Sequence, residues 1–256
     1  MSDPTLITFP PSLDSEFSRF LLAHYGVRHR EERHVMPLSL LFTLPRGSIR
    51  FPLLYGNGLR LNRVKEFVDH FEPLAPPERR LVPPGLGATM RADWKIFHHE
   101  LNTPMTVWAY HHLLPHRDIM VEPLSRGTPR WEAKAVERAY PLFKGLLLVM
   151  LRPTERRATA ALGKIRGVLD RIDARLADGR RYLNGERYSL SDMAYAVAAA
   201  PVVWPDEYGG GIPALSDTPP ALQAVVAETR ARPSGELALR IYREHRAGPP
   251  GAQGQQ

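Results

Sequence analysis

The stretch YLNGERYSLSDMAYA, residues 182–196, combines a turn, a helix start and the beginning of an apolar helix. Ser189 is a favoured N-cap residue, and Asp192 follows three positions later. The Ser189 hydroxyl can accept a hydrogen bond from a first-turn amide, while the Asp192 carboxylate accepts one from the Ser189 amide. The residues that follow are almost wholly apolar through Trp204, which predicts a helix buried on all sides. Ser189 and Asp192 are therefore predicted to be structural caps.

From residue 88 onward, the pattern of apolar residues predicts helices, and no stretch has a convincing strand pattern. Residues 88–114 are expected to be helical with an interruption near Pro104. Apolar residues recur at helical spacing in residues 154–177. Further helices are expected at 130–151, 222–229 and 236–245.

Residues before position 72 alternate between strand and helix patterns. Strands at 6–9 and 27–35 flank a helix at 16–25, which Gly26 should end. The pattern at 36–45 is ambiguous.

A hairpin is expected next, with strands at 49–55 and 59–61 and a turn at Asn57–Gly58. A helix at 62–71 follows, and then residues 72–87 hold five prolines, which is typical of a linker. We therefore expect four segments: an α/β domain at 1–74, a linker at 75–88, an all-helical domain at 89–246 and a disordered tail at 247–256.

The composition excludes several classes of chemistry. The 256 residues include no cysteine, so disulfides and thiolate metal sites are excluded. No apolar run is long enough for a transmembrane helix, and the N-terminus lacks a secretory pattern. The net charge of +7 is spread among acidic residues, so nucleic-acid binding is not favoured. We expect a cytoplasmic protein with no membrane partner.

The element order and three motifs resemble the soluble, cytosolic-type glutathione S-transferase family, in particular its bacterial serine-type members. Residues 182–196 are similar to the family pattern L-x-G-x-x-x-S/T-x-A-D. The resemblance implies an α+β two-domain fold, with a thioredoxin-like α/β domain followed by an all-α domain. It also implies glutathione as cosubstrate and a homodimer.

The second motif, RFPLLYGNG at residues 50–58, is similar to the family's V-P-x-L strand and turn. The resemblance implies that Pro52 follows a cis peptide bond and that the Phe51 backbone contacts the cysteinyl part of glutathione. The alternative is an ordinary edge-strand proline whose missing donor faces away from the ladder.

The third motif, SLDSEFSRFLLAHYG at residues 12–26, resembles the opening loop of serine-type members. The match implies that Ser15 is the catalytic serine that donates to the glutathione thiolate, with Ser12 as runner-up. A helix N-terminus also favours an anion. The alternative is that Ser15 or Asp14 is only an N-cap.

Arg63 and Val64 depart from the family, because they occupy the positions of an acidic residue and a serine that bind the γ-glutamyl group. Arg50 and Arg63 could instead form an edge that attracts anions. The resemblance places the acceptor pocket between the domains, lined by Trp108, Tyr110, His111 and His112; the alternative is that these residues belong to the core.

No metal site is expected, since FHHEL at residues 97–101 lacks the spacing of a zinc protease. The resemblance implies a transferase that adds the glutathione thiolate to a small electrophile, as in detoxification. The alternative is a non-catalytic binding or interaction protein of the same fold that has lost standard glutathione binding.

Overall fold

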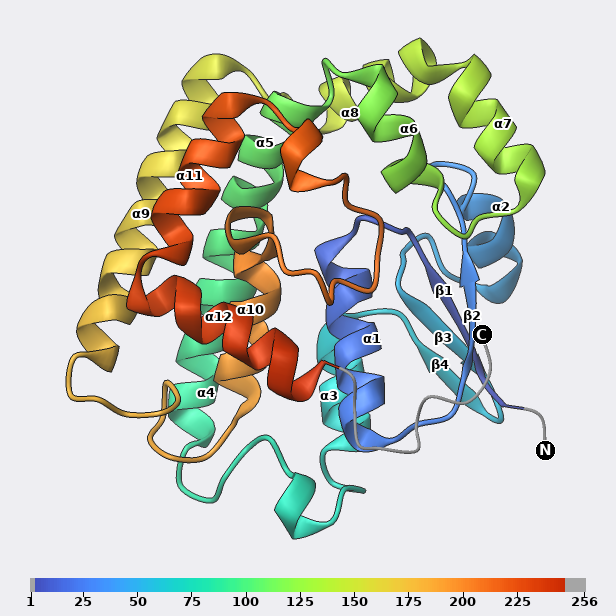
Figure 1. The fold of residues 1–256 in the computed structure, drawn as a ribbon. Coiled ribbons are helices and arrows are strands. Elements are labelled where there is room, and N and C mark those ends of the chain that lie inside the picture. The colour runs from blue at the N-terminus through green and yellow to red at the C-terminus, as the bar shows by residue number, and fades with distance from the viewer. Residues whose placement is uncertain (1–2, 247–256) are drawn as a thin grey trace.

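The computed structural model describes residues 3–246, which form one sheet and a larger set of helices (Figure 1). The strands are β1 (Thr5–Thr8), β2 (Arg30–Arg33), β3 (Leu53–Gly56) and β4 (Leu59–Leu61). The helices are α1 (Leu13–Tyr25), α2 (Leu40–Thr43), α3 (Val64–Phe71), α4 (Gly87–Trp94), α5 (Asn102–Leu113), α6 (Arg117–Ser125), α7 (Arg130–Arg138), α8 (Tyr140–Leu151), α9 (Glu155–Leu176), α10 (Leu190–Val203), α11 (Pro220–Arg230) and α12 (Pro233–His245). A π-helical segment, Lys95–Leu101, joins α4 to α5.

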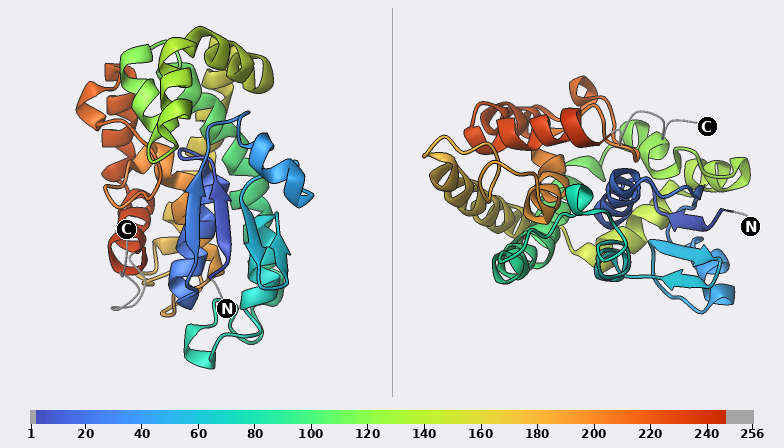
Figure 2. Two further views of the ribbon diagram at one scale, coloured as in Figure 1. Left: turned by 90° about the vertical axis from the view of Figure 1, so that its right-hand side faces the viewer. Right: turned by 90° about the horizontal axis from the view of Figure 1, so that it is seen from below.

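The sheet has the strand order β2-β1-β3-β4. Strand β2 is parallel to β1, whereas β3 runs antiparallel to both β1 and β4. The central strands contribute fully buried side chains such as Leu6 and Leu54, which face each other across the β1–β3 pair. Helix α1 lies between the sheet and the helices of the C-terminal half (Figures 1 and 2).

Helix α10 is the centre of the helical domain. It packs against α1, α4, α5, α11 and α12. Of its residues only Pro201 is not fully buried, because the helix has neighbours on every side. The prediction of an all-round buried helix is confirmed.

Helices α6 to α8 connect the end of α5 to the start of α9 and reach across to the sheet (Figure 1). Glu132 of α7 makes the link. Its two carboxylate oxygens lie 2.6 Å from His34 Nδ1 and 2.7 Å from the Val35 amide, at the end of β2. Glu132 is fully buried, so α7 is held against the α/β domain by a buried polar contact.

The predicted fold class, a thioredoxin-like domain followed by an all-helical domain, is confirmed. Gly26 adopts φ +68° and ends α1. Asn57 and Gly58 both have positive φ, as a two-residue hairpin turn requires. The peptide bond between Phe51 and Pro52 is cis, as the family resemblance implied.

Several expectations need correction. The helix expected at 130–151 is two helices, α7 and α8, which meet at Ala139, and the strand expected at 49–55 covers only Leu53–Gly56. The second strand covers only Arg30–Arg33 rather than residues 27–35. Helix α6 was not expected, because Pro123 inside it interrupts the helical pattern of the sequence. The break near Pro104 lies earlier, at the π-helical segment, because Pro104 sits in the first turn of α5, where a missing amide needs no partner. The predicted tail at 247–256 lies outside the described residues.

Candidate functional site

The loop between β1 and α1 ends at Ser12, the N-cap of α1. The Ser12 hydroxyl oxygen accepts a hydrogen bond from the Ser15 amide at 3.3 Å. Its side chain is partly exposed. The hydroxyl proton of Ser12 is therefore available at a helix N-terminus, where unpaired amides and the helix dipole favour an anion.

Ser15 lies in the first turn of α1 and is fully buried. Its hydroxyl oxygen accepts a hydrogen bond from the Phe9 amide at 3.2 Å, which ties the loop to the helix. A side chain in this position does not meet a ligand from solvent. The geometry therefore favours the runner-up, Ser12, over Ser15 as the candidate thiolate donor.

The cis-proline loop lies beside the Ser12 loop. The rings of Phe51 and Phe9 make an edge contact, with centroids 5.6 Å apart. Arg50, by contrast, is exposed. The structure therefore brings Phe51 and Pro52 next to the start of α1.

The start of α3 lacks the polar pair of the family. Arg63 is the N-cap residue, but its side chain makes no capping hydrogen bond and is exposed. Val64 is only 4% exposed and packs in the core. The Asn62 amide donates to Glu66 Oε2 at 2.8 Å, so Glu66 caps this helix from within. Residues 63–66, at the start of α3, thus present two cations, Arg63 and Lys65, and no side-chain hydroxyl.

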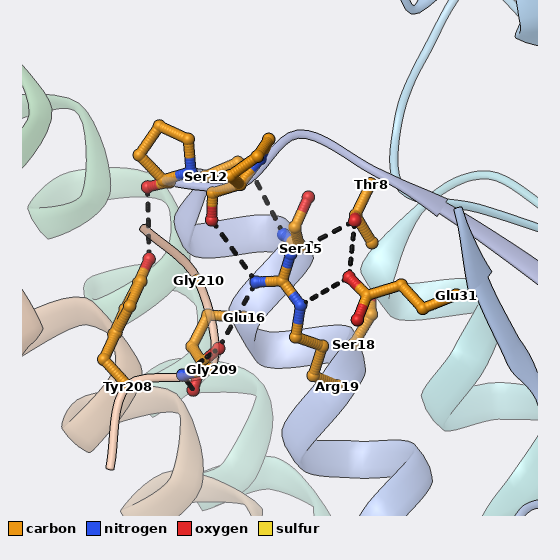
Figure 3. A network of polar contacts seen from close by, with 12 residues as sticks. Thr8, Ser12, Ser15, Glu16, Ser18, Arg19, Glu31, Tyr208, Gly209 and Gly210 are labelled. Atoms are coloured by element: carbon orange, nitrogen blue, oxygen red, sulfur yellow. Dashed lines mark hydrogen bonds and ion pairs between the residues drawn. The ribbon is translucent and has the colours of Figure 1, made fainter. Parts of the chain in front are cut away.

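A buried ionic network supports the Ser12 loop (Figure 3). Arg19 of α1 donates to Glu31 Oε1 of β2 at 2.7 Å and to the Thr8 hydroxyl at 3.1 Å. It also donates to the Pro10 carbonyl at 3.4 Å. Burial opposes the ionisation of Glu31, but the charges of Arg19 and Arg33 outweigh it and hold the pKa of Glu31 at about 2.

Glu16 belongs to the same network and points away from the Ser12 hydroxyl side of the loop (Figure 3). It is fully buried and accepts hydrogen bonds from Arg246 Nε at 2.6 Å and from the Gly209 amide. Arg19 Nη1 lies 3.4 Å from its other oxygen. The positive charges of Arg246 and Arg19 balance the negative charge of the carboxylate. Through its hydrogen bond with the Gly209 amide, Glu16 anchors the segment after α10.

That segment, EYGGG at residues 207–211, packs directly on the Ser12 loop. The Tyr208 hydroxyl donates to the Pro11 carbonyl at 3.1 Å. A Cβ on Gly210 would lie 1.9 Å from the Pro10 carbonyl oxygen, so only glycine fits. The sequence motifs assign no chemistry to this segment, although three consecutive glycines beside an aromatic residue indicate such a close approach.

A cleft of about 560 Å³, including its open mouth, begins at Pro11 and Leu13. Its walls come from α5, α6, the end of α10 and residues 208–213, and none of the lining residues is charged. Tyr110 lines it, as the resemblance implied. Burial raises the pKa of Tyr110, which keeps its hydroxyl protonated. Within residues 3–246 that hydroxyl has no hydrogen-bond partner.

The other three residues expected in the pocket do not line this cleft. Trp108 is 1% exposed and belongs to the core. The ring of His111 contacts the Pro153 carbonyl at 2.9 Å, and His112 packs its ring against Trp108. For Trp108 the structure matches the alternative that it is a core residue.

The Ser189–Asp192 cap is present as predicted. The Ser189 amide donates to Asp192 Oδ2 at 2.9 Å, and the Ser189 hydroxyl donates to the same oxygen at 2.6 Å. The Leu183 amide donates to the other oxygen at 2.8 Å. Burial raises the pKa of Asp192 to about 6 despite these donors.

No group of three or more histidine, aspartate or glutamate side chains in residues 3–246 is arranged to hold a metal ion. Over the same range, every helix is too short or too polar to cross a bilayer.

Fold and site together define a two-domain protein with the glutathione transferase architecture, in which the start of α1 meets a cis-proline loop and an interdomain cleft. Residues 134–228 match the family model of the glutathione S-transferase C-terminal domain. Over this stretch, the chain is similar to the glutathione S-transferase family.

Solved structures agree along nearly the whole chain. A glutathione S-transferase of Ceriporiopsis subvermispora in complex with glutathione is 15% identical, with a TM-score of 0.58 over 97% of this chain and 100% of that one. One from Rhodospirillum rubrum F11 is 21% identical, with a TM-score of 0.52 over 94% and 98%. At these identities the likeness concerns the fold alone. A search of curated proteins gave no match.

Proposed function

We propose that this protein is a glutathione S-transferase-like enzyme that joins the thiolate of glutathione to an electrophilic small molecule. The observation that carries the proposal is Ser12, a partly exposed N-cap in the loop whose Phe9 contacts Phe51 of the cis-proline segment. Its two neighbours, Pro11 and Leu13, line an uncharged cleft.

In this proposal the glutathione sulfur lies at the N-terminus of α1. The Ser12 hydroxyl donates a hydrogen bond to the sulfur, and the helix dipole adds to the stabilisation of the thiolate. Phe51 offers its backbone to the cysteinyl unit. The thiolate then attacks an electrophilic carbon, a sulfur–carbon bond forms, and the displaced group leaves with its electron pair.

The cleft from Leu13 to Ile212 is the proposed acceptor site. Its lack of charged lining residues favours an uncharged acceptor. The protonated Tyr110 hydroxyl would donate to an oxygen of the acceptor as negative charge develops there. Trp108, His111 and His112 are not included in this proposal.

The second candidate is a non-catalytic binding protein of the same fold. Arg63 and Val64 favour it, since a cation at Arg63 repels the ammonium of the γ-glutamyl group. Arg50 and Arg63 would then offer cations to a different anionic ligand.

Calorimetric titration with glutathione, followed by a conjugation assay with chlorodinitrobenzene, separates the two candidates. The enzyme is expected to bind glutathione and to form the conjugate above the uncatalysed rate. Binding without turnover contradicts the proposed enzyme activity. The absence of both binding and turnover contradicts the proposed function and favours the second candidate, which has lost standard glutathione binding.

The proposal includes a homodimer and a cytoplasmic location, both carried over from the family resemblance. Light scattering on the purified protein tests the first, and cell fractionation tests the second. A monomer in solution would contradict the homodimer, and recovery of the protein in the membrane fraction would contradict the location.

A further inference from the structure

A second polar cluster lies in the first turn of α1, on the side that faces the helical domain. Asp14 Oδ1 accepts a hydrogen bond from Asn102 Nδ2 of α5 at 3.1 Å. His98 Nδ1, in the π-helical segment, lies 3.8 Å from the same oxygen. Within residues 3–246, Asp14 Oδ2 has no hydrogen-bond partner.

The cluster lines a separate shallow recess of about 240 Å³, a volume that includes its open side. Its other walls are apolar side chains of α1, α4, the π-helical segment and α10. The ring of Trp94 stacks on His98 with centroids 4.8 Å apart, which fixes the imidazole over the wall of the recess. An acid and a histidine are thus held together in a largely apolar recess.

This recess adjoins the proposed thiol site. Asp14 follows Ser12 by two residues in the same turn, and Leu13 between them borders both the recess and the acceptor cleft. Asp14 and Ser12 therefore flank the same helix end from two sides. The proposed function uses Ser12 but leaves the Asp14 carboxylate without a role.

We propose that Asp14, positioned by Asn102 and His98, is the general base that removes the thiol proton of glutathione at the start of α1. The inference rests on the proposed function, because it needs the thiol to bind there. Ser12 stabilises the thiolate once it has formed, whereas Asp14 takes the proton.

The step balances without any further reactant. The sulfur–hydrogen bond breaks, its electron pair stays on sulfur, and Asp14 Oδ2 receives the proton. Asp14, whose side chain is 38% exposed, then releases the proton to solvent. The titratable groups that face Asp14 are His98 and His99; α5 contributes only Asn102 and α10 only apolar residues. Burial raises the pKa of Asp14 and lowers the pKa of His98, which brings the two closer together.

The test is the pH profile of kcat/KM for conjugation, measured with Asp14→Asn. Asparagine keeps the shape and the contact with Asn102 but cannot accept a proton. We expect a loss of about a hundredfold near pH 6, within the usual range for general base catalysis. The loss should shrink as the pH rises past the pKa of the bound thiol, which Ser12 and the helix dipole hold below the ordinary value near 8.5, because the thiol then ionises unaided.

Two histidine variants complete the test. His98→Gln should show a smaller loss with the same pH dependence, and His116→Gln, at an exposed position that does not line the recess, should match the wild type. Calorimetry of all variants with glutathione separates binding from chemistry. A wild type that does not bind glutathione contradicts the proposed function and this inference with it. Normal binding with a loss in Asp14→Asn that is absent or equal at every pH overturns the inference alone.

Discussion

The Ser12 hydroxyl accepts a hydrogen bond from the Ser15 amide, so the first serine caps the helix in which the second is buried. Only the capping residue keeps its hydroxyl at the surface. Two serines three positions apart thus have different roles, and their substitutions should be separable.

Ser12→Ala is expected to lower kcat/KM for glutathione conjugation about a hundredfold, as the loss of a donor to a developing anion does. Its stability should fall by about 1 kcal/mol through the lost cap. Ser15→Ala leaves the buried Phe9 amide without an acceptor and should cost roughly 1–3 kcal/mol of unfolding free energy. Its kcat/KM should stay near the wild-type value. Steady-state kinetics measure kcat/KM of the two variants, and urea unfolding measures their stability. A large loss of kcat/KM in Ser15→Ala with none in Ser12→Ala would identify Ser15 as the thiolate donor.

Glu31 should make the free energy of unfolding depend on pH in the acid range. Its pKa of about 2 in the folded protein is below the unfolded value of 4.5, so its ionised form stabilises the fold. The contribution, about 3 kcal/mol at most, is fully present above pH 4.5 and is lost as the pH falls toward 2.

Urea unfolding of wild type and Glu31→Gln at several pH values measures this. The stability difference should be largest near neutral pH and should shrink below pH 4.5. Glu32→Gln is the matched control, since its partner Arg30 is exposed and such pairs contribute roughly 0–1 kcal/mol. A Glu31 difference that does not change with pH would contradict the assigned network.

Gly210→Ala should separate residues 208–211 from the Ser12 loop. The new Cβ would lie 1.9 Å from the Pro10 carbonyl oxygen, and backbone on both sides must move. We expect a lower melting temperature together with a lower kcat, because the loop that carries Ser12 is displaced. Gly163→Ala in α9 has open space for the methyl group and should raise stability by about 0.5–1 kcal/mol. Unchanged kinetics in Gly210→Ala would show that this contact does not position Ser12.

Much of the fold follows from local sequence signals. Ser189 and Asp192 predict their helix start because the capping geometry lies within four residues, and Asn57–Gly58 predicts its turn through positive φ. Helix α6 escaped prediction because Pro123 breaks the pattern, while packing against α7 supports the helix.

The candidate site was only partly predictable. The motif match identified the right loop, but which serine faces outward depends on where α1 begins, and that is decided by the contact between Ser15 and Phe9. The pairing of Asp14 with His98 joins two distant segments and has no local signal. Tyr110 and His111 are neighbours in sequence, yet only the first reaches the cleft, because adjacent helical residues face different sides.

Arg63→Glu tests how glutathione is anchored. An acidic side chain at the start of α3 would pair with the γ-glutamyl ammonium, and a charge-assisted contact of about 1.5 kcal/mol corresponds to about tenfold tighter binding. Lys65→Glu makes the same charge change at the next exposed position and should leave the affinity nearly unchanged. Calorimetric titration gives both dissociation constants. Weaker binding by Arg63→Glu would mean that Arg63 itself holds a carboxylate of the ligand.

The pKa of the bound glutathione thiol, followed by its ultraviolet thiolate absorbance across pH, tests the central claim most directly. If α1 and Ser12 stabilise the thiolate, the thiol bound to the wild type should ionise at least one unit below the ordinary value near 8.5. Ser12→Ala should return the thiol toward that value. A wild type that binds glutathione but leaves its thiol pKa unchanged would contradict the account.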